Sequence, residues 1–312
     1  MIENAFIFPG QGSQSIGMAK EFYDNFNEAK LVFEEVNDTL GKDLTKIMFE
    51  GPEDLLTDTE NAQPAIMTAS IAILKVLEKE SGKNINELCS YVAGHSLGEY
   101  TALCASESLS LRDTARLLKV RGKAFADAGK KNAGIMVALV GATIEQAKEV
   151  AEKAKIDGEI CQVANDNTVG QVVLSGHINS MNKAIEVATE MKIKRAIMLK
   201  VAGAFHSELM LPAVEEMKEI LENVVINVPK VKVIANYTAN IENVSEIKDN
   251  LLKQITGSVK WRETMLLLEK LGMNKFVEIG SAKVLTNMVS KTCSNVNAIA
   301  INSIESMKGF IS

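Results

Sequence analysis

Short apolar runs alternate with segments of helical periodicity along most of the chain. Runs of about four to eight apolar residues have the length of buried strands, and apolar positions recurring every third or fourth residue indicate helices that bury one face. The alternation predicts an α/β protein with a largely parallel sheet. The expected strands are 5–8, 90–93, 231–236, 275–279 and 297–301, and the expected helices are 21–40, 65–80, 97–104, 111–128, 211–222 and 259–271.

The middle of the chain follows a different order of elements. The expected strands there are 134–140, 160–164, 171–174 and 195–199, and the expected helices are 143–155 and 179–191. Read in chain order this is βαββαβ, the split pattern of ferredoxin-like folds. We therefore expect a discontinuous large domain, residues 1–128 and 200–312, with residues 129–199 inserted as a ferredoxin-like subdomain.

Composition narrows the class of protein without identifying it. The 46% hydrophobic and 24% charged residues are typical of a globular protein, and the net charge of −6 with no extended basic tract argues against a nucleic-acid partner. The four cysteines form no C-x-x-C pair and are expected to be reduced thiols. No secretory signal is recognisable, and the longest apolar run, 133–142, is too short to cross a bilayer. We expect a cytoplasmic protein that does not bind a membrane.

Gly94-His95-Ser96-Leu97-Gly98 fits the G-x-S-x-G pattern between an expected strand and an expected helix. Such a turn lifts the serine oxygen above the sheet edge, and the two glycines let strand and helix approach closely. Ser96 would lie at a helix N-terminus, where free N–H groups such as that of Leu97 favour developing negative charge. The alternative is a structural capping box between Ser96 and Glu99. The glycines favour a nucleophile.

A serine nucleophile needs a base, and the chain has three histidines. His95 adjoins the serine inside the turn, so its side chain is expected to point to the opposite side. His177 lies in the inserted segment, where a loop or capping role is expected. His206 comes after the serine, the order found in hydrolase-like folds. A structural role for His206 stays open, but elimination favours it as the base.

Arg121 lies inside the apolar stripe of the helix over 111–128. Its neighbours one turn before and after it are Leu117, Leu118, Ala124 and Phe125. A guanidinium in such a place is unfavourable unless it meets an anion. Periodicity leaves two interpretations equally open: an internal salt bridge, or a bidentate site for the carboxylate of a substrate.

The segment Gly10-Gln11-Gly12 follows a strand, so a dinucleotide-binding loop has to be considered. That fingerprint needs a third glycine where Ser15 stands, and an acidic residue at the end of a second strand where a helix is expected. The dinucleotide interpretation therefore fails. A loop whose backbone N–H at Gln11 faces Ser96 remains open.

Taken in order, the motifs of this chain resemble those of bacterial malonyl-coenzyme A:acyl carrier protein transacylases, which serve type II fatty acid synthesis. The resemblance runs nearly end to end. The motifs are Phe8-Pro9-Gly10-Gln11-Gly12-Ser13-Gln14, Gln63-Pro64-Ala65, Gly94-His95-Ser96-Leu97-Gly98-Glu99-Tyr100, Arg121-Gly122, Ala164-Asn165, Ala204-Phe205-His206-Ser207 and Trp261. Each motif alone is a weak indication of this family, but the occurrence of all of them in this order is specific for it.

The resemblance implies an α/β-hydrolase-like core with an inserted ferredoxin-like subdomain and an active site between them. It implies Ser96 as nucleophile, His206 as base, and the N–H groups of Gln11 and Leu97 as oxyanion donors. It further implies that the backbone carbonyl of Gln254, in Leu252-Lys253-Gln254, orients His206 in place of a triad acid. Truncating the Gln254 side chain should then matter little.

The same resemblance gives Arg121 the role of binding the malonyl carboxylate, and we expect Asn165 and Phe205 to contact the substrate. The implied reaction is ping-pong malonyl transfer from malonyl-coenzyme A to acyl carrier protein. No metal or other cofactor is expected, and we expect a monomer. The alternatives are a transacylase of the same fold in a polyketide pathway, a serine esterase or thioesterase, and a non-catalytic module that binds acyl carriers.

Overall fold

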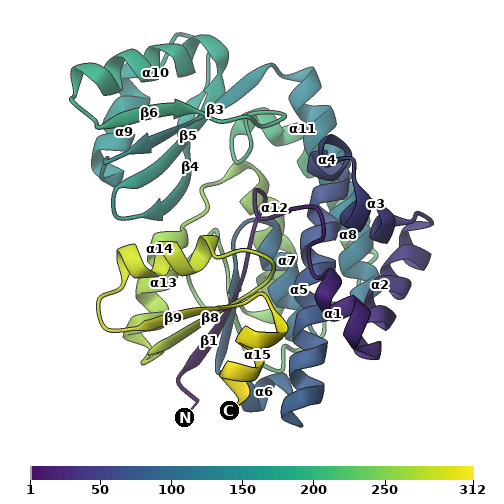
Figure 1. The fold of residues 1–312 in the computed structure, drawn as a ribbon. Coiled ribbons are helices and arrows are strands. Elements are labelled where there is room, and N and C mark those ends of the chain that lie inside the picture. Colours follow the sequence, from purple (N-terminus) through teal and green to yellow (C-terminus); the bar gives the residue numbers. More distant parts are fainter. Residues whose placement is uncertain (1) are drawn as a thin grey trace.

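The computed structural model describes residues 2–312, and its larger sheet has five strands. The strand order is β7-β2-β1-β8-β9, with β1 at Asn4–Phe8, β2 at Tyr91–Gly94, β7 at Lys232–Ile234, β8 at Lys275–Ile279 and β9 at Asn297–Ile301. Every neighbouring pair runs parallel, which confirms the predicted sheet. Figure 1 shows these strands in the lower half of the molecule, flanked by helices.

Both faces of this sheet are buried. Phe6 and Phe8 of β1 belong to one apolar cluster, whereas Ala5 and Ile7 belong to another, because successive side chains of a strand point to opposite faces. The first cluster includes residues of α2 (Asn27–Leu40), α5 (Thr59–Ser81), α7 (Leu97–Ala105), α8 (Leu111–Lys131) and α11 (Leu211–Glu222). The second includes residues of α13 (Trp261–Lys270) and α14 (Val284–Thr292). Two-sided burial explains the continuous apolar runs of these strands.

The inserted segment forms a separate four-stranded antiparallel sheet of order β4-β5-β3-β6. Its strands are β3 (Gly134–Val140), β4 (Cys161–Thr168), β5 (Gln171–His177) and β6 (Arg195–Met198), and its helices are α9 (Ile144–Ala154) and α10 (Ile178–Glu190). The predicted βαββαβ order is therefore confirmed, and the segment has its own apolar cluster. Helix α8 runs to Lys131, past the expected boundary at residue 128, and the domain boundaries stay a prediction.

Some helices differ from the sequence prediction. The helix expected over 21–40 is two helices, α1 (Lys20–Asn25) and α2, because Phe26 between them is extended. Helix α5 starts before the expected residue 65, since the side chain of Asp58 caps it and Pro64 lies inside it. The remaining helical elements were not predicted: α3 (Leu44–Glu50), α4 (Glu53–Thr57), α6 (Ile85–Leu88), η1 (Glu208–Met210), η2 (Val244–Glu246), α12 (Ile247–Thr256), α14 and α15 (Ile304–Ile311).

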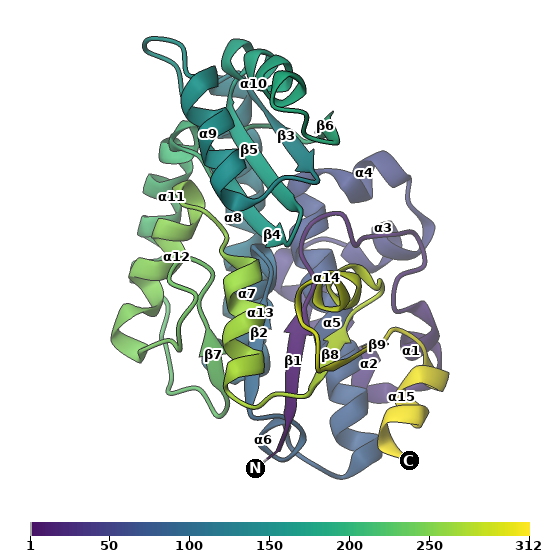
Figure 2. The same cartoon turned by 90° about the vertical axis from the view of Figure 1, so that its left-hand side faces the viewer.

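Strand β4 joins the inserted sheet to the larger layer, where it lies beside α13 and α14 (Figure 2). The backbone of Val259 donates to Ala164 O at 2.8 Å and accepts from Asp166 N at 2.9 Å. The buried carboxylate of Asp166 also binds Arg262 of α13, with contacts of 2.7–3.0 Å. The two layers are thus fixed together beside the carboxyl end of β2, where Ser96 lies. None of the helices formed by residues 2–312 has the length and hydropathy needed to span a membrane.

Candidate active site

Ser96 occupies a tight turn between β2 and α7, with φ 55° and ψ −110°. Glycines on each side make this turn feasible. A Cβ on Gly94 would lie 1.8 Å from Gly98 O, and a Cβ on Gly98 would lie 2.3 Å from Phe8 O. Ser96 makes no side-chain capping bond, so the structural alternative of a capping box does not hold. Its hydroxyl is therefore available for other partners.

The hydroxyl of Ser96 faces a histidine that is itself held by a backbone carbonyl. Ser96 Oγ lies 2.8 Å from His206 Nε2, and His206 Nδ1 lies 2.8 Å from the carbonyl oxygen of Gln254. A carbonyl can accept but not donate, so Nδ1 carries the ring proton and Nε2 is left to accept from Ser96. The arrangement has the geometry of a nucleophile, a general base and an orienting group without a carboxylate.

Burial, followed by the positive charge of Arg121, lowers the pKa of His206 to about 3. The hydrogen bond to Gln254 opposes this shift only in part. His206 is consequently neutral at neutral pH, the form that can remove a proton from Ser96.

The other two histidines contact different partners. His95 Nε2 lies 2.8 Å from Asn167 Oδ1, and the ring packs edge-on against Trp261. His95 is among the residues that line the same cavity as Ser96, but its ring is bonded to Asn167 and not to Ser96. The expected orientation of its side chain stays a prediction. His177 accepts a hydrogen bond from the backbone N–H of Ile160 within that sheet, a local structural role.

Arg121 is 1% exposed and reaches Ser96 directly. Its Nη2 donates to Ser96 Oγ at 3.1 Å and to Gln254 Oε1 at 2.8 Å, and its Nη1 donates to Gln63 Oε1 at 2.8 Å. The guanidinium also lies over the ring of Phe125, 4.2 Å from its centroid. All three hydrogen-bond acceptors are neutral.

These contacts decide between the two interpretations of Arg121. Within residues 2–312 it forms no ion pair with a carboxylate, and its buried Nε has no hydrogen-bond partner. A buried cation with neutral partners and an unused N–H group can still take a carboxylate. The internal salt bridge is thus not found, and a substrate-carboxylate site fits the geometry.

The site opens into a cavity of about 260 Å³ between the two layers. Every residue expected to act through its side chain lines it. Gln254, expected to act through its backbone carbonyl, does not line it and lies behind His206 and Arg121. The lining includes Gly10, Gln11, His95, Ser96, Arg121, Met136, Asn165, Leu199, Phe205, His206 and Met288. The rings of Phe205 and Phe125 pack with centroids 5.1 Å apart, and Asn165 is almost fully buried.

The glycine-rich loop lies directly against the serine turn. A Cβ on Gly10 would be 2.7 Å from His95 O, so a larger residue there would push the loop away. Gln11 lines the cavity, and Leu97 is the first residue of α7, where backbone N–H groups have no partner within the helix. The backbone N–H groups of Gln11 and Leu97 thus belong to the two segments that border Ser96. Their role as oxyanion donors stays a prediction.

Two side chains that no sequence motif indicates hold this site together. Asn236, just after β7, accepts from Ser96 N at 2.7 Å and donates to Gly94 O at 2.7 Å. The amide of Gln254 donates to Ser96 O and to Glu99, while its oxygen accepts from Arg121. The expectation that the Gln254 side chain matters little is therefore at odds with its contacts. Neither residue has a local signature, because its partners lie more than 130 residues away.

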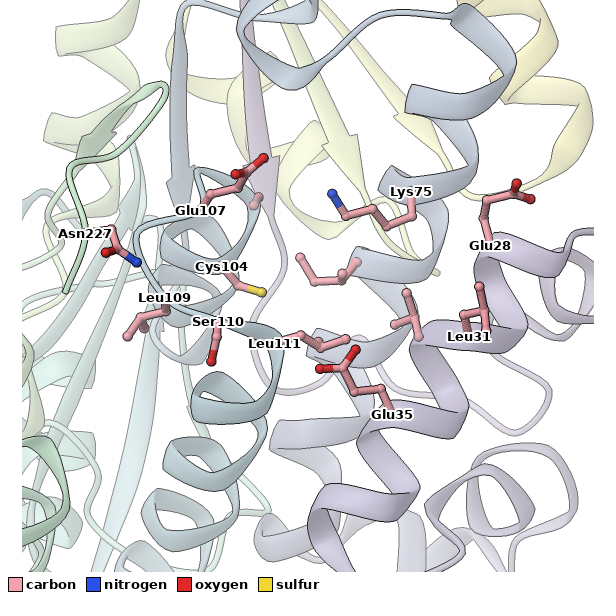
Figure 3. A pocket seen from close by; sticks show the side chains of 13 residues that line it. Glu28, Leu31, Glu35, Lys75, Cys104, Glu107, Leu109, Ser110, Leu111 and Asn227 are labelled. Carbon is pink, nitrogen blue, oxygen red and sulfur yellow. The ribbon is translucent and has the colours of Figure 1, made fainter. Parts of the chain in front are cut away.

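A second, larger hollow of about 520 Å³ lies away from Ser96 (Figure 3). Its walls come from α2, α5, the end of α7 and the start of α8. Leu31, Leu109 and Leu111 give it an apolar lining, and Glu28, Glu35 and Lys75 stand at its edges. Each of these charged groups already has an ion-pair partner. The residues of the serine site do not line it.

Comparison with known proteins agrees with this geometry. The family model described as "Acyl transferase domain" matches residues 5–308, and the chain belongs to this acyl transferase family. It is 41% identical to the malonyl CoA-acyl carrier protein transacylase of Bacillus subtilis, over 99% of this chain and 96% of that protein. The resemblance to malonyl transacylases drawn from the motifs is thereby confirmed.

Solved structures agree in fold over the whole chain. An acyl-carrier-protein-S-malonyltransferase from Bartonella henselae superposes with a TM-score of 0.95 at 44% identity, covering 99% of this chain and 98% of that one. A malonyl-transacylase solved in complex with its type II PKS acyl-carrier protein gives a TM-score of 0.93 at 32% identity, covering 99% and 98%. The predicted fold class is therefore confirmed.

Proposed function

We propose that this protein transfers a malonyl group from malonyl-coenzyme A to the phosphopantetheine thiol of acyl carrier protein through an ester on Ser96. One observation supports this above all others: Ser96 Oγ lies 2.8 Å from a neutral histidine and 3.1 Å from a buried guanidinium. The base suits attack on a thioester, and the cation suits an acyl group that ends in a carboxylate. Malonyl thioesters combine both features.

In the first half-reaction, His206 Nε2 takes the proton of Ser96 as Oγ attacks the thioester carbon. The tetrahedral oxyanion is stabilised by the N–H groups of Gln11 and Leu97, and its collapse breaks the C–S bond. The departing coenzyme A thiolate takes the proton from His206. In the second half-reaction, the carrier thiol gives its proton to His206 and attacks the ester, and Ser96 recovers a proton as it leaves.

Substrate selection in this proposal depends on Arg121 and the residues around it. A planar guanidinium can hold the malonyl carboxylate by two charged hydrogen bonds, which an acetyl group cannot use. Phe205 packs against Phe125 beside Arg121 and bounds the acyl end of the cavity, and Asn165 faces it from β4. We propose these two residues as substrate contacts.

The reaction as proposed needs no metal or redox cofactor, because side chains of the chain supply the nucleophile, the base and the cation. Malonyl-coenzyme A and an acyl carrier protein are the proposed partners. Exposed Lys130, Lys131, Lys192, Lys194 and Arg195 beside the inserted sheet are candidates for docking an acidic carrier. A cytoplasmic location and a monomeric state stay predictions.

The second candidate function is the same malonyl transfer in a polyketide pathway instead of fatty acid synthesis. A relative of the same fold was solved with a type II PKS acyl-carrier protein, and the chemistry at the serine would be identical. Transfer rates to fatty-acid and polyketide carrier proteins, measured side by side, would separate the two. Fatty acid synthesis predicts a higher kcat/KM for the fatty-acid carrier.

Mass spectrometry of the intact protein after mixing with malonyl-coenzyme A tests the proposal most directly. We expect the addition of one malonyl group on Ser96, no addition in Ser96→Ala, and release of the group to a carrier thiol faster than to water. Rapid hydrolysis without transfer would instead identify a thioesterase. Absence of labelling in the wild type would favour a binding module.

A further inference from the structure

A fully buried glutamate, Glu99, and a partly buried one, Glu242, meet behind Gln254, outside the cavity. Glu99 lies on α7 one turn after Ser96 and is fully buried. Its Oε2 accepts hydrogen bonds from the side chain of Gln254 and from the backbone N–H of Asn236. Glu242 follows β7, and its Oε2 accepts from Asn250 of α12 at 2.8 Å.

Each carboxyl group has one buried oxygen without a donor, Oε1 in both residues. The two carboxyl groups are close neighbours, because the charge of Glu242 raises the pKa of Glu99 and a hydrogen bond with Glu99 lowers the pKa of Glu242. Two ionised carboxylates are acceptors only, so this contact requires a proton on one of them. A single shared proton accounts for both otherwise unpartnered oxygens and leaves the pair with one negative charge.

The charges and burial around Glu99 and Glu242 favour a state in which the pair holds one proton. Burial is the largest cause that raises the pKa of Glu99, to about 8, and of Glu242, to about 7. Repulsion between the two carboxyls adds to the shift of Glu99, and Glu246 adds to that of Glu242. The positive charge that opposes the shift of Glu99 is that of Arg121, which lies on the other side of the Gln254 amide.

Gln254 connects this pair to the reacting groups. Its backbone carbonyl holds His206, its amide oxygen accepts from Arg121, and its amide nitrogen is anchored on Glu99 and on Ser96 O. A displacement of Glu99 would therefore move the group that orients the base and the group that holds the cation at the same time.

We propose that Glu99 and Glu242 share one proton and that Glu99 thereby acts as the positioning residue that fixes Gln254 for malonyl transfer. The inference rests on the proposed function. Loss of the shared proton would place a second negative charge behind Arg121. That charge would oppose binding of the malonyl carboxylate without affecting an acetyl group.

The kinetic test compares loading of Ser96 from malonyl- and acetyl-coenzyme A across pH. In the wild type we expect the KM for malonyl-coenzyme A to rise several-fold above about pH 8, with no such rise for acetyl-coenzyme A. Glu99→Gln preserves an acceptor for Gln254 and supplies a donor for Glu242. It should keep kcat at neutral pH within about threefold and abolish the alkaline rise.

Glu99→Ala removes the anchor and should lower kcat about 10- to 100-fold for both acyl groups, the effect of misplacing catalytic groups. Glu278→Gln is the matched control, since Glu278 is also a fully buried glutamate but lies on β8 and bonds Thr286. Glu278→Gln should still show the rise in the KM for malonyl-coenzyme A at alkaline pH. The inference is overturned if Glu99→Gln loses as much activity as Glu99→Ala, or if the rise persists in Glu99→Gln.

Infrared difference spectroscopy tests the shared proton without catalysis. A protonated-carboxyl C=O band should titrate above about pH 8, persist in Ser96→Ala and disappear in Glu99→Gln. If the band is present but the wild type does not load malonyl, the proposed function fails while the proton pair stands. If loading occurs but Glu99→Gln leaves the band unchanged, the inference fails alone. This spectrum also decides the question if Glu99→Ala does not fold.

Discussion

Arg121 Nη2 donates a hydrogen bond to Ser96 Oγ at 3.1 Å, so the cation expected to select the substrate touches the nucleophile itself. The serine oxygen accepts this charged bond while it donates to His206 at 2.8 Å. A nearby positive charge stabilises the alkoxide form of the serine and disfavours the imidazolium form of the base. Selectivity and reactivity are therefore coupled through one guanidinium.

Arg121→Ala should abolish most malonyl loading. Removing one partner of a desolvated charged pair costs on the order of 3 to 5 kcal/mol. Acetyl loading should fall much less, because it loses only the hydrogen bond to Ser96. Arg121→Lys should recover part of the malonyl rate, since an ammonium cannot form the planar fork. Loading rates for both acyl groups, measured by mass spectrometry, check this. An equal loss of malonyl and acetyl loading would contradict a role of Arg121 in binding the malonyl carboxylate.

The rate at which Ser96 is loaded should fall in acid only at a pH well below the usual pKa of histidine. The reason is that the pKa of His206 is lowered to about 3. The base is lost only when His206 gains a proton, so activity falls as pH decreases through that value. Arg121→Ala removes the second cause of the shift, and its acidic limb for acetyl loading should move to higher pH. Single-turnover rates between about pH 2 and 8 measure this. An acidic limb at the same pH in both proteins would contradict it.

Replacement of His206 itself should slow both half-reactions. Loss of a general base commonly reduces the rate by about 10² to 10⁴. His177→Ala is the matched control, because His177 bonds Ile160 N inside the inserted sheet and does not reach Ser96. It should transfer malonyl at nearly the wild-type rate. The reverse result would mean that the wrong histidine has been identified as the base.

Gln254→Ala should lower the rate for both acyl groups, although the backbone carbonyl that holds His206 remains. The substitution removes the acceptor of Arg121 and the donor to Glu99 and to Ser96 O. Leaving such buried partners unsatisfied costs about 1 to 3 kcal/mol each. Lys253→Ala, one residue away and half-exposed, is the control. Wild-type kinetics in Gln254→Ala would restrict its role to the backbone.

Asn236→Ala should reduce malonyl and acetyl loading by the same factor, unlike Arg121→Ala. The buried amide holds both sides of the serine turn, at Ser96 N and Gly94 O. Its loss leaves two buried backbone groups unpaired and should also lower the melting temperature. Asn240→Ala, in an exposed turn nearby, provides the comparison. A selective loss of malonyl loading would contradict a role confined to the turn.

The parts of the site that sequence could predict are those with local signatures. Ser96 lies between glycines required by close packing, and Arg121 interrupts an apolar helical stripe. His206 followed from elimination among three histidines. Asn236 and the side chain of Gln254 could not be predicted, since nothing near them in the chain indicates their partners.

The strands were predicted more closely than the helices, because buried parallel strands give continuous apolar runs. Several missed helices are short, whereas α12 has buried apolar residues at helical spacing, Ile247, Leu251 and Ile255, and could have been predicted from them. Helix α14 could have been inferred from another signal. Parallel strands β8 and β9 are separated by residues 280–296, and such a crossover usually contains a helix.

The ion pair between Asp166 and Arg262 constrains the design of chimeric enzymes. Residues 129–199 look like a transferable unit, and exchanging them between relatives is an obvious way to alter acyl preference. Asp166 would travel with that unit, but Arg262 on α13 would stay behind. A mismatched recipient would contain a buried carboxylate without its partner, at the seam where the reaction cavity is formed. Successful grafts should therefore exchange the unit and position 262 together.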